Sequence, residues 1–317
     1  MREGTAESPG RAERPIAGNS VMALVVAMRP YQWPKNLLVF AALAFSAGEA
    51  WTLDDLGGLW ELLGRSLVLF ACWCLASSGT YLVNDVRDRE LDRQHPRKRR
   101  RPIASGALSV QVALGAAVVL WAVALPVATV VDALAGGILA GYVVLMVLYS
   151  AGLKAVPVLD VLILCAGVVG RAVSGAAGID VGISPWLYMC ASCAAFFFAS
   201  SKRWSEFRQL GEEAAHHRPS LAGYSGEILN QMVVIGAATA LISYALYTIE
   251  SDYVPTNGAM AITLPFVVFA LFRYLLLLSG KRQKDAPDQI LFTDPGIVLA
   301  MAGWLVTAMA VLISDRT

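Results

Sequence analysis

Charged side chains are scarce in this chain of 317 residues. Only 15% of the residues are Asp, Glu, Lys or Arg, whereas 57% are hydrophobic. A soluble domain of this size would carry roughly 25% charged residues. The shortage argues against one large soluble domain and predicts a polytopic membrane protein. The formal net charge of +1 is uninformative, because the few charges are distributed unevenly along the chain.

Cysteine is also sparse, and its positions exclude a disulfide framework. All five cysteines lie in apolar segments, where the residue behaves as a small hydrophobe. The Cys190-x-x-Cys193 pair has no second pair and no nearby histidine, so it does not indicate a zinc or redox site. Residues 1–20 lack the apolar core of a signal peptide. We expect a disordered cytosolic tail over residues 1–20 and a single transmembrane catalytic domain over residues 21–317.

Long apolar runs dominate the rest of the chain. A spanning helix needs about 20 mostly apolar residues, and nine segments are predicted to cross the membrane. The first is short and extends back through an amphipathic stretch, and the third and fourth should form a tight hairpin. The nine segments are Asn36–Ala50, Leu62–Val83, Val110–Val131, Ala133–Leu153, Val158–Ala177, Pro185–Ser200, Leu229–Ile249, Ala259–Ser279 and Pro295–Ile313.

Lysine and arginine orient these spans. Every other connection is basic, including the segments that hold Arg29 and Lys35, the run from Arg97 to Arg101, and the pair Lys202 and Arg203. The alternate connections carry mainly Asp and Glu. Because basic loops stay in the cytoplasm, the N-terminus and the basic loops are predicted to be cytosolic and the C-terminus to lie outside.

A group of acidic residues follows the second predicted span, in the stretch NDVRDRELD. On a helix, the spacings of three and four residues place Asn84, Asp85, Asp88 and Asp92 on one face. Like charges at that spacing repel unless a cation lies between them, and oxygen ligands of this kind suit magnesium bound to substrate phosphates. The alternative is a solvated helix end in which Asp88 pairs with the neighbouring Arg87 or Arg89.

The basic run that follows has two interpretations. It anchors the loop at anionic lipid headgroups, or it binds the phosphates of a magnesium-phosphate ligand. Other polar side chains on the same side of the membrane favour the second: Tyr149, Lys154, Lys202, Arg203 and Glu206.

Arg171 stands out because an arginine within an apolar span is costly and usually faces a polar interior. Asp160 precedes it by 11 residues, about three helical turns, and so lies on nearly the same face. The sequence predicts that Arg171 lines a substrate cavity; the alternative is a structural Asp–Arg contact.

These motifs resemble a known family. NDVRDRELD is similar to the N-D-x-x-D-x-x-x-D motif of the UbiA-type intramembrane prenyltransferases. The resemblance is closest to the decaprenyl-phosphate phosphoribosyltransferase branch and extends from Met28 to Pro295. It implies an all-α protein of the bacterial plasma membrane, with nine transmembrane helices around a central cavity open to the cytosol. The stretches that carry it are RPYQWPKN, HPRKRRRPIASG, YSAGLKAVPVLD, GRAVSGAAG, SKRWSEF and APDQILFTDP.

The resemblance also implies a reaction. Family members that use a prenyl diphosphate carry a second aspartate-rich motif after the sixth span, where this chain has Lys202, Arg203 and Glu206. This departure favours the branch that transfers 5-phosphoribosyl from phosphoribosyl pyrophosphate to a polyprenyl (decaprenyl) phosphate. Diphosphate is released, and the product serves synthesis of an arabinose donor for cell-wall glycans. The implied partners are the two substrates and the bilayer, with trimeric assembly and no nucleic acid.

Site residues follow from the same resemblance. Asp85, Asp88 and Asp92 are the expected catalytic carboxylates, and Mg²⁺ would be held through Asn84, Asp88 and Asp92 with support from Asp85. The donor phosphates would meet Lys98, Arg99 and Arg101, with Gln32, Lys35 and Asn36 nearby. The rest of the pocket would be lined by Tyr149, Lys154, Arg171, Lys202, Arg203 and Glu206.

Three other functions stay open at this point. A prenyltransferase acting on an aromatic or haem-like acceptor would normally show a second aspartate cluster. A transporter could use Asp160 and Arg171 on its pathway, but the chain shows no internal repeat. An inactive lipid-binding scaffold would tolerate the substitution Asp88→Asn.

Overall fold

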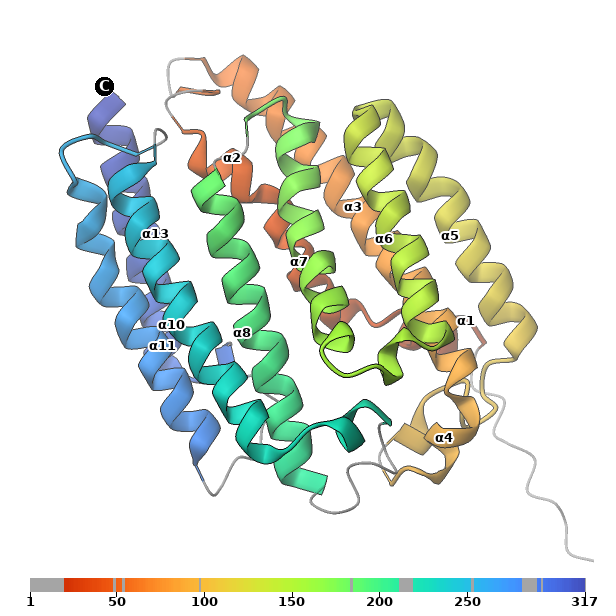
Figure 1. The fold of residues 1–317 in the computed structure, drawn as a ribbon. Coiled ribbons are helices and arrows are strands. Elements are labelled where there is room, and N and C mark those ends of the chain that lie inside the picture. Colours follow the sequence, from red (N-terminus) through yellow and green to blue (C-terminus); the bar gives the residue numbers. More distant parts are fainter. Residues whose placement is uncertain are drawn as a thin grey trace, which may run out of the picture.

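The chain folds as a bundle of long helices (Figure 1). The computed structural model describes residues 20–47, 50–52, 55–96, 98–182, 185–210, 219–251, 254–280, 290–291 and 293–316. Within those ranges there is no named β-strand, only one isolated bridge between Ala47 and Trp51. The predicted all-α class is therefore confirmed. The predicted tail up to residue 19, Arg97 of the basic run and half of the APDQILFTDP stretch lie outside the described residues.

All named elements in the described ranges are helices. In chain order they are α1 Ser20–Met28, η1 Pro30–Phe40, α2 Ala41–Phe45, α3 Leu56–Arg87, α4 Arg89–Gln94, η2 Lys98–Arg100, α5 Val110–Val131, α6 Ala133–Ala151, η3 Leu153–Ala155, α7 Leu159–Gly178, α8 Pro185–Leu210, η5 Pro219–Gly223, α10 Gly226–Glu250, η6 Ala259–Thr263, α11 Leu264–Ser279 and α13 Pro295–Arg316.

Seven helices in the described part of the chain are long and apolar enough to cross a membrane. They correspond to the predicted second to fifth and seventh to ninth spans. The seven are α3, α5, α6, α7, α10, η6 together with α11, and α13. This agreement confirms an integral membrane protein with several spans, while the other two predicted spans have a different form.

The first predicted span, Asn36–Ala50, is not a regular α-helix. The 3₁₀ helix η1 covers 11 residues and contains Pro34, and the α-helix α2 that follows has only 5 residues. Proline has no backbone N–H to donate, which disfavours regular α-helix here. Because a 3₁₀ helix rises about 2.0 Å per residue and an α-helix about 1.5 Å, the two together extend roughly 30 Å.

The sixth predicted span, Pro185–Ser200, forms part of a longer helix. Helix α8 has 26 residues and continues past Ser200 through Lys202, Arg203 and Arg208. It is long enough to cross a bilayer but less apolar than the seven helices above. Its last turns therefore carry polar side chains into the interior of the bundle.

The predicted hairpin between the third and fourth spans is confirmed. Asp132 is the single residue between α5 and α6, and its carboxylate accepts a hydrogen bond of 2.7 Å from the N–H of Ala135. An aspartate at this N-cap position satisfies one of the free donors of the helix start. The two helices pack closely because a Cβ at Gly136 would come within 2.6 Å of the Thr129 Cα.

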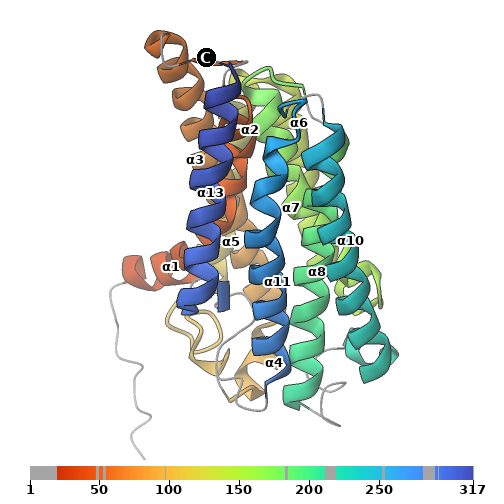
Figure 2. The same ribbon diagram turned by 90° about the vertical axis from the view of Figure 1, so that its left-hand side faces the viewer.

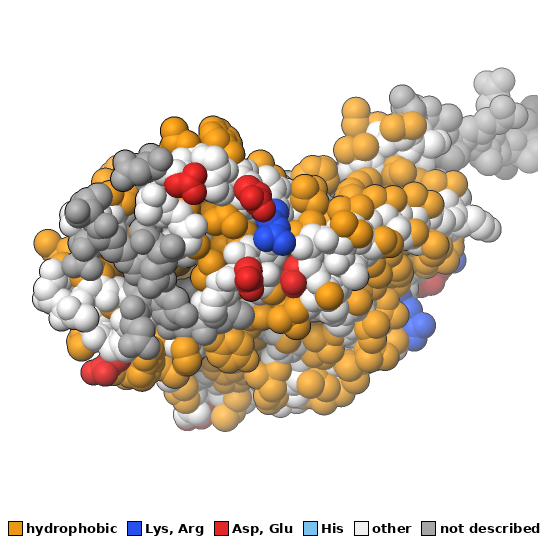
Figure 3. Space-filling view, turned by 90° about the horizontal axis from the view of Figure 1, so that it is seen from above, with side chains coloured by type: hydrophobic (Ala, Val, Ile, Leu, Met, Phe, Trp, Pro, Cys, Tyr) orange, Lys and Arg blue, Asp and Glu red, His pale blue; other side chains and the backbone are white. Residues whose placement is uncertain are grey.

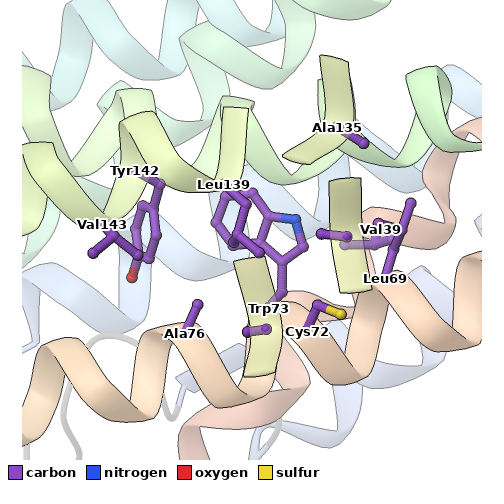
Figure 4. Packing of buried hydrophobic residues seen from close by; sticks show 11 residues of the cluster. Val39, Leu69, Cys72, Trp73, Ala76, Ala135, Leu139, Tyr142 and Val143 are labelled. Atoms are coloured by element: carbon purple, nitrogen blue, oxygen red, sulfur yellow. The ribbon is translucent and has the colours of Figure 1, made fainter. Parts of the chain in front are cut away.

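The core of one half of the bundle is built around Trp73 of α3. Its ring lies 4.8 Å from that of Tyr142 on α6, and its indole N–H donates to Ser174 Oγ of α7 at 3.0 Å. Figure 4 shows the Trp73 ring beside Leu139, with Val39 and Leu69 on its other side. A buried tryptophan of this kind typically contributes about 3–5 kcal/mol relative to alanine. Trp73 therefore joins three helices.

The two ends of the bundle differ. Elements α4, η2, η3 and η5 gather at one end, which we call the α4 end, and the C-terminus lies at the other (Figure 1). Figure 2 shows α1 projecting from the side of the bundle near the α4 end. Figure 3 looks onto the opposite end, which is largely hydrophobic or uncharged and carries acidic side chains but little basic surface.

Helix α7 packs against η1 at a glycine. A Cβ at Gly175 would lie 2.0 Å from the carbonyl oxygen of Val39, a backbone atom that cannot rotate away. By contrast, a Cβ at Gly170, five residues earlier on the same helix, would meet nothing closer than 3.5 Å. Gly175 therefore allows the proline-containing segment to lie against α7.

We expect Gly175→Ala to destabilise the protein by about 1–3 kcal/mol, because the added methyl group overpacks the contact. Gly170→Ala is the matched control and should be neutral or stabilising, since alanine favours helix over glycine by about 1 kcal/mol. The measurement is the thermal unfolding midpoint of the purified protein in detergent. Equal midpoints for the two variants would contradict the close contact with η1.

Candidate active site

A cavity of about 580 Å³ opens at the α4 end of the bundle. It is lined by the end of α3 and by α4, the segment around η2, the end of α6, η3, α8 and η5. The structure brings ten of the predicted site residues into this lining. They are Asn84, Asp88, Asp92, Lys98, Arg101, Tyr149, Lys154, Lys202, Arg203 and Glu206.

Six predicted site residues are not part of the lining. Arg99 is exposed to solvent, and Asn36 and Arg171 are buried in the bundle. Asp85 is buried and not part of the lining, and Gln32 and Lys35 lie in η1, also outside the lining. The six are Gln32, Lys35, Asn36, Asp85, Arg99 and Arg171.

The acidic motif lies where α3 gives way to α4. Helix α3 ends at Arg87, and Asp88 has φ −88° and ψ 2°, outside the regular helical range. The backbone still follows the helical pattern, because the N–H of Asp88 donates to Asn84 O at 2.9 Å and that of Asp92 to Asp88 O at 2.8 Å. The predicted shared face is thus retained across the joint.

Each carboxylate of the motif has a cationic partner. Asp85, only 2% exposed, bonds to Arg29 and, at 3.1 Å, to Arg101. Asp92 accepts from the same Arg101 nitrogen at 2.7 Å. Asp88 pairs with Lys154 of η3. The alternative in which Asp88 pairs with a neighbouring arginine is therefore wrong, because Arg87 donates to the Ala151 carbonyl and Arg89 to Glu90.

Two opposing effects act on the pKa of the Asp92 carboxyl group. Burial raises the pKa of this carboxyl above its ordinary value, and the adjacent Arg101 guanidinium opposes that rise. A cation held nearby favours the charged form of a carboxyl group. Asp92 is therefore a group whose charge state depends on which cations share the cavity with it.

The residues of the motif can supply only some of the oxygen ligands that a metal ion needs. Among the described residues, no group of three or more His, Cys, Asp or Glu side chains is arranged to hold a metal. Asn84, Asp88 and Asp92 nevertheless line the same cavity, and Ser150 donates to Asn84 Oδ1 at 3.3 Å. Mg²⁺ often uses only one or two carboxylates and completes its shell with water and substrate phosphates. This donor set fits Mg²⁺ on those terms.

Arg29 lines the cavity, although the sequence pattern indicated only that its segment is cytosolic. It lies between α1 and η1 with φ 57°, a left-handed conformation, and its guanidinium sits 4.9 Å from the centroid of the Tyr81 ring. The pair with Asp85 turns it into the lining. His95, which lacked metal-ligand spacing in the sequence, also lines the cavity. The sequence spacing does not reveal that Arg29 and His95 line the cavity, because both positions depend on contacts between distant segments.

Arg171 does not line the cavity, contrary to the prediction. Its guanidinium donates to Asn36 Oδ1 at 2.7 Å and lies 4.8 Å from the Trp73 ring and 5.0 Å from the Tyr142 ring. Asp160, which precedes Arg171 on α7, pairs with Arg203 instead. Arg171 therefore joins η1 to α3, α6 and α7, and its charge rests on aromatic faces and amide or carbonyl oxygens.

Arg203, and not Arg171, is the partner of Asp160, so the alternative of an Asp160–Arg171 contact is wrong. Its Nε donates to Asp160 Oδ2 at 2.6 Å, and both side chains are almost completely buried. The two terminal nitrogens donate to Glu206 and to the Tyr149 hydroxyl, each at 3.2 Å. The guanidinium thus forms the inner wall of the cavity and holds two other lining residues.

Basic side chains outnumber acidic ones around the cavity. Six Lys or Arg residues line it, against three acidic residues, Asp88, Asp92 and Glu206. Two further carboxylates, Asp85 and Asp160, are buried behind the wall. Such a cavity can bind a polyanion and, at the motif, a divalent metal ion. The six basic residues are Arg29, Lys98, Arg101, Lys154, Lys202 and Arg203.

The sequence has relatives over almost its whole length. A decaprenyl-phosphate phosphoribosyltransferase of Mycolicibacterium smegmatis is 31% identical over 313 residues, covering 94% of this chain and 96% of that protein. A protein of the same name from Corynebacterium glutamicum is 33% identical over 306 residues, covering 93% of this chain and 88% of that protein.

The fold has solved counterparts as well. A UbiA homolog from Archaeoglobus fulgidus, solved with GPP and Mg²⁺, has a TM-score of 0.69 and 19% identity, covering 92% of this chain and 99% of that chain. The model of the UbiA prenyltransferase family matches residues 37–294, which include the acidic motif, the η2 segment and the polar turns of α8. The resemblance drawn from the sequence motifs is confirmed, and the chain belongs to the UbiA prenyltransferase family.

Proposed function

We propose that this protein transfers 5-phosphoribosyl from phosphoribosyl pyrophosphate to a polyprenyl phosphate and releases diphosphate. Relatives named decaprenyl-phosphate phosphoribosyltransferase match it along nearly the full chain. The structural observation that carries the proposal is the charge of the cavity, where six basic residues accompany an acidic motif of the family.

The charge of the lining suits these two substrates. Phosphoribosyl pyrophosphate carries a 5-phosphate and a diphosphate, and the lipid adds another phosphate. A prenyl diphosphate and a neutral aromatic acceptor would bring far less negative charge into the same space. Lys202 and Arg203 stand where a second acidic motif would bind metal for a prenyl diphosphate. Preorganised cations of this kind stabilise charge that develops on phosphate oxygens.

Asn84, Asp88 and Asp92 are the residues that would hold Mg²⁺. When bound, Mg²⁺ supplies positive charge that stabilises the diphosphate as a leaving group. Asp85 acts differently from the expectation that it supports the metal, because it is already bonded to Arg29 and Arg101. Its role in the proposal is to hold these two guanidinium groups at the cavity edge.

The other lining residues bind and orient the substrates. Lys98, Arg101 and Lys154 lie on the side of the acidic motif and would bind the donor phosphates, while Lys202 lies on α8. The lipid phosphate is ionised near neutral pH, so its attack on the ribose C1 needs no strong general base. Ribose C1 gains oxocarbenium character as the diphosphate leaves, and the nearby carboxylates favour that positive charge.

The same proposal includes the placement of the protein. The cavity and the N-terminus would face the cytosol of a bacterial cell across its plasma membrane, because the basic segments lie at the α4 end. The opposite end carries acidic side chains and little basic surface (Figure 3). The proposal also includes nine membrane crossings, made by the seven apolar helices together with η1–α2 and α8. A single catalytic domain over residues 21–317 and trimeric assembly complete it.

The direct test uses purified protein, radiolabelled phosphoribosyl pyrophosphate, decaprenyl phosphate and Mg²⁺. We expect label to move into the organic phase, and EDTA to abolish this transfer until excess Mg²⁺ restores it. No transfer, together with turnover of a prenyl diphosphate and an aromatic acceptor, would replace the proposal with prenyl transfer on the same fold.

Asp88→Asn should reduce Mg²⁺-dependent turnover by at least roughly a hundredfold, because it removes charge that holds the metal in the transition state. Glu90→Gln is the matched control, since Glu90 is an exposed carboxylate of α4 that does not line the cavity. The measurement is the initial rate of each variant and of the wild type at several Mg²⁺ concentrations. Wild-type rates in Asp88→Asn would rule out its metal role.

Lys202→Ala should raise the KM for one of the two phosphate substrates by roughly 10–100-fold, because hydrogen bonds to charged groups contribute about 1.5–3 kcal/mol. Arg273→Ala is the control, since Arg273 pairs with Asp294 between α11 and α13 and lies outside the cavity lining. Steady-state kinetics with each substrate varied in turn gives both constants. Unchanged KM values for both substrates would place Lys202 outside the binding site.

A further inference from the structure

A buried carboxylate behind the cavity wall receives hydrogen bonds from three segments. Asp160, at the start of α7, is 0% exposed and does not line the cavity. It accepts from Arg203 of α8 at 2.6 Å and from the hydroxyl groups of Ser220 and Tyr224 at 3.0 and 2.9 Å. These three donors come from α8, from η5 and from the residue that follows η5 in the turn before α10.

The chain just before Asp160 is strained. Val158 has φ 67° and ψ −49°, and the N–H of Leu159 donates to the Pro157 carbonyl at 2.8 Å, which together form a γ-turn of positive φ. This turn is rare and strained, and a β-branched residue with positive φ is an outlier. Such strain persists only where surrounding contacts hold it.

The Tyr224 hydroxyl supplies that contact. It accepts a hydrogen bond from the N–H of Val158 and donates its own proton to Asp160. The turn also lies tightly against η5, because a Cβ at Gly223 would come within 2.4 Å of the Pro157 ring. One hydroxyl group thus links the strained turn to the buried carboxylate.

The protonation of Tyr224 agrees with this double role. Burial and the bond to Asp160 raise the pKa of Tyr224 to about 12, although the Val158 N–H acts in the opposite direction. The phenol therefore stays protonated at neutral pH and can donate to the carboxylate while it accepts from the backbone.

The contacts of Asp160 and Tyr224 support two cavity residues, one on η3 and one on α8. Lys154 lies in η3, a few residues before the strained turn, and pairs with Asp88 of the acidic motif. Arg203 lies on α8 and holds Tyr149 and Glu206 in the lining. We propose that Asp160 and Tyr224 are positioning residues that set Lys154 and Arg203 on the cavity wall while themselves remaining outside it. For its effect on catalysis, this inference rests on the proposed function.

The first experiment removes only the hydroxyl group. Tyr224→Phe should raise the KM for an anionic substrate about tenfold and leave kcat within about twofold. A tenfold change corresponds to about 1.4 kcal/mol, close to the upper value of about 1.5 kcal/mol that one hydrogen bond contributes. Tyr244→Phe is the matched control: its buried hydroxyl bonds to Thr263 and Trp304, far from the cavity lining. The control should lower the unfolding midpoint without changing either kinetic constant.

The second experiment tests the strained turn through a double-mutant cycle. Glycine adopts positive φ without strain, so in a Val158→Gly background the hydroxyl has less to hold. We expect Tyr224→Phe to raise the KM less than about threefold there. An equal tenfold effect in both backgrounds would overturn the link to Val158, and an unchanged KM in Tyr224→Phe would overturn the positioning role altogether.

A readout independent of turnover separates this inference from the proposed function. Hydrogen–deuterium exchange of residues 153–160 should become faster in Tyr224→Phe than in wild type, and should not change in Tyr244→Phe. If wild type transfers nothing from phosphoribosyl pyrophosphate, the proposed function fails while the exchange measurement still tests the contact. Unchanged exchange in Tyr224→Phe would overturn the inference whichever reaction the protein catalyses.

Discussion

Pairing of buried charges between distant segments is the interaction on which the α4 end of this protein depends. Asp85 of α3 is bonded to Arg29 and Arg101, and Asp160 of α7 to Arg203 of α8. Breaking such a pair by removing one partner typically costs about 3–5 kcal/mol, because the remaining charge stays buried. Loops that would otherwise move in water are therefore held against the helices, and the cavity obtains its shape from these bonds.

The same pairs explain how an acidic motif and a basic run can share one site. Asp88 and Asp92 have Lys154 and Arg101 as counterions. In the proposed reaction, a phosphate donor and its metal ion bring charges of both signs, so each carboxylate can exchange a side-chain cation for the metal. The released cations then face the phosphates. Such an exchange keeps a positive partner beside each carboxylate, which limits the energetic cost of binding.

Local pattern was enough to predict the hairpin at Asp132, most of the spans and the acidic motif, since each depends on neighbours in the sequence. The broken first span was not predicted, because apolar content does not reveal that two prolines favour 3₁₀ geometry. The partner of Asp160 was also missed. The spacing along α7 places Arg171 on nearly the same face as Asp160. The tertiary fold, however, packs α8 against α7 and so supplies Arg203 as the partner.

The location of the buried carboxylates determines which cations act most strongly on a substrate. Asp160 offsets Arg203 and Asp85 offsets Arg29 from behind the wall, so these arginines serve mainly to shape the lining. In the proposed reaction, the field at the phosphates would then come chiefly from Arg101, from the lining lysines and from any bound metal ion. Lysine is a compact charge on a flexible stem, which suits phosphates that move apart during transfer. In the proposed reaction, Lys202 would therefore act on the phosphates more strongly than Arg203, because the charge of Arg203 is already balanced by Asp160.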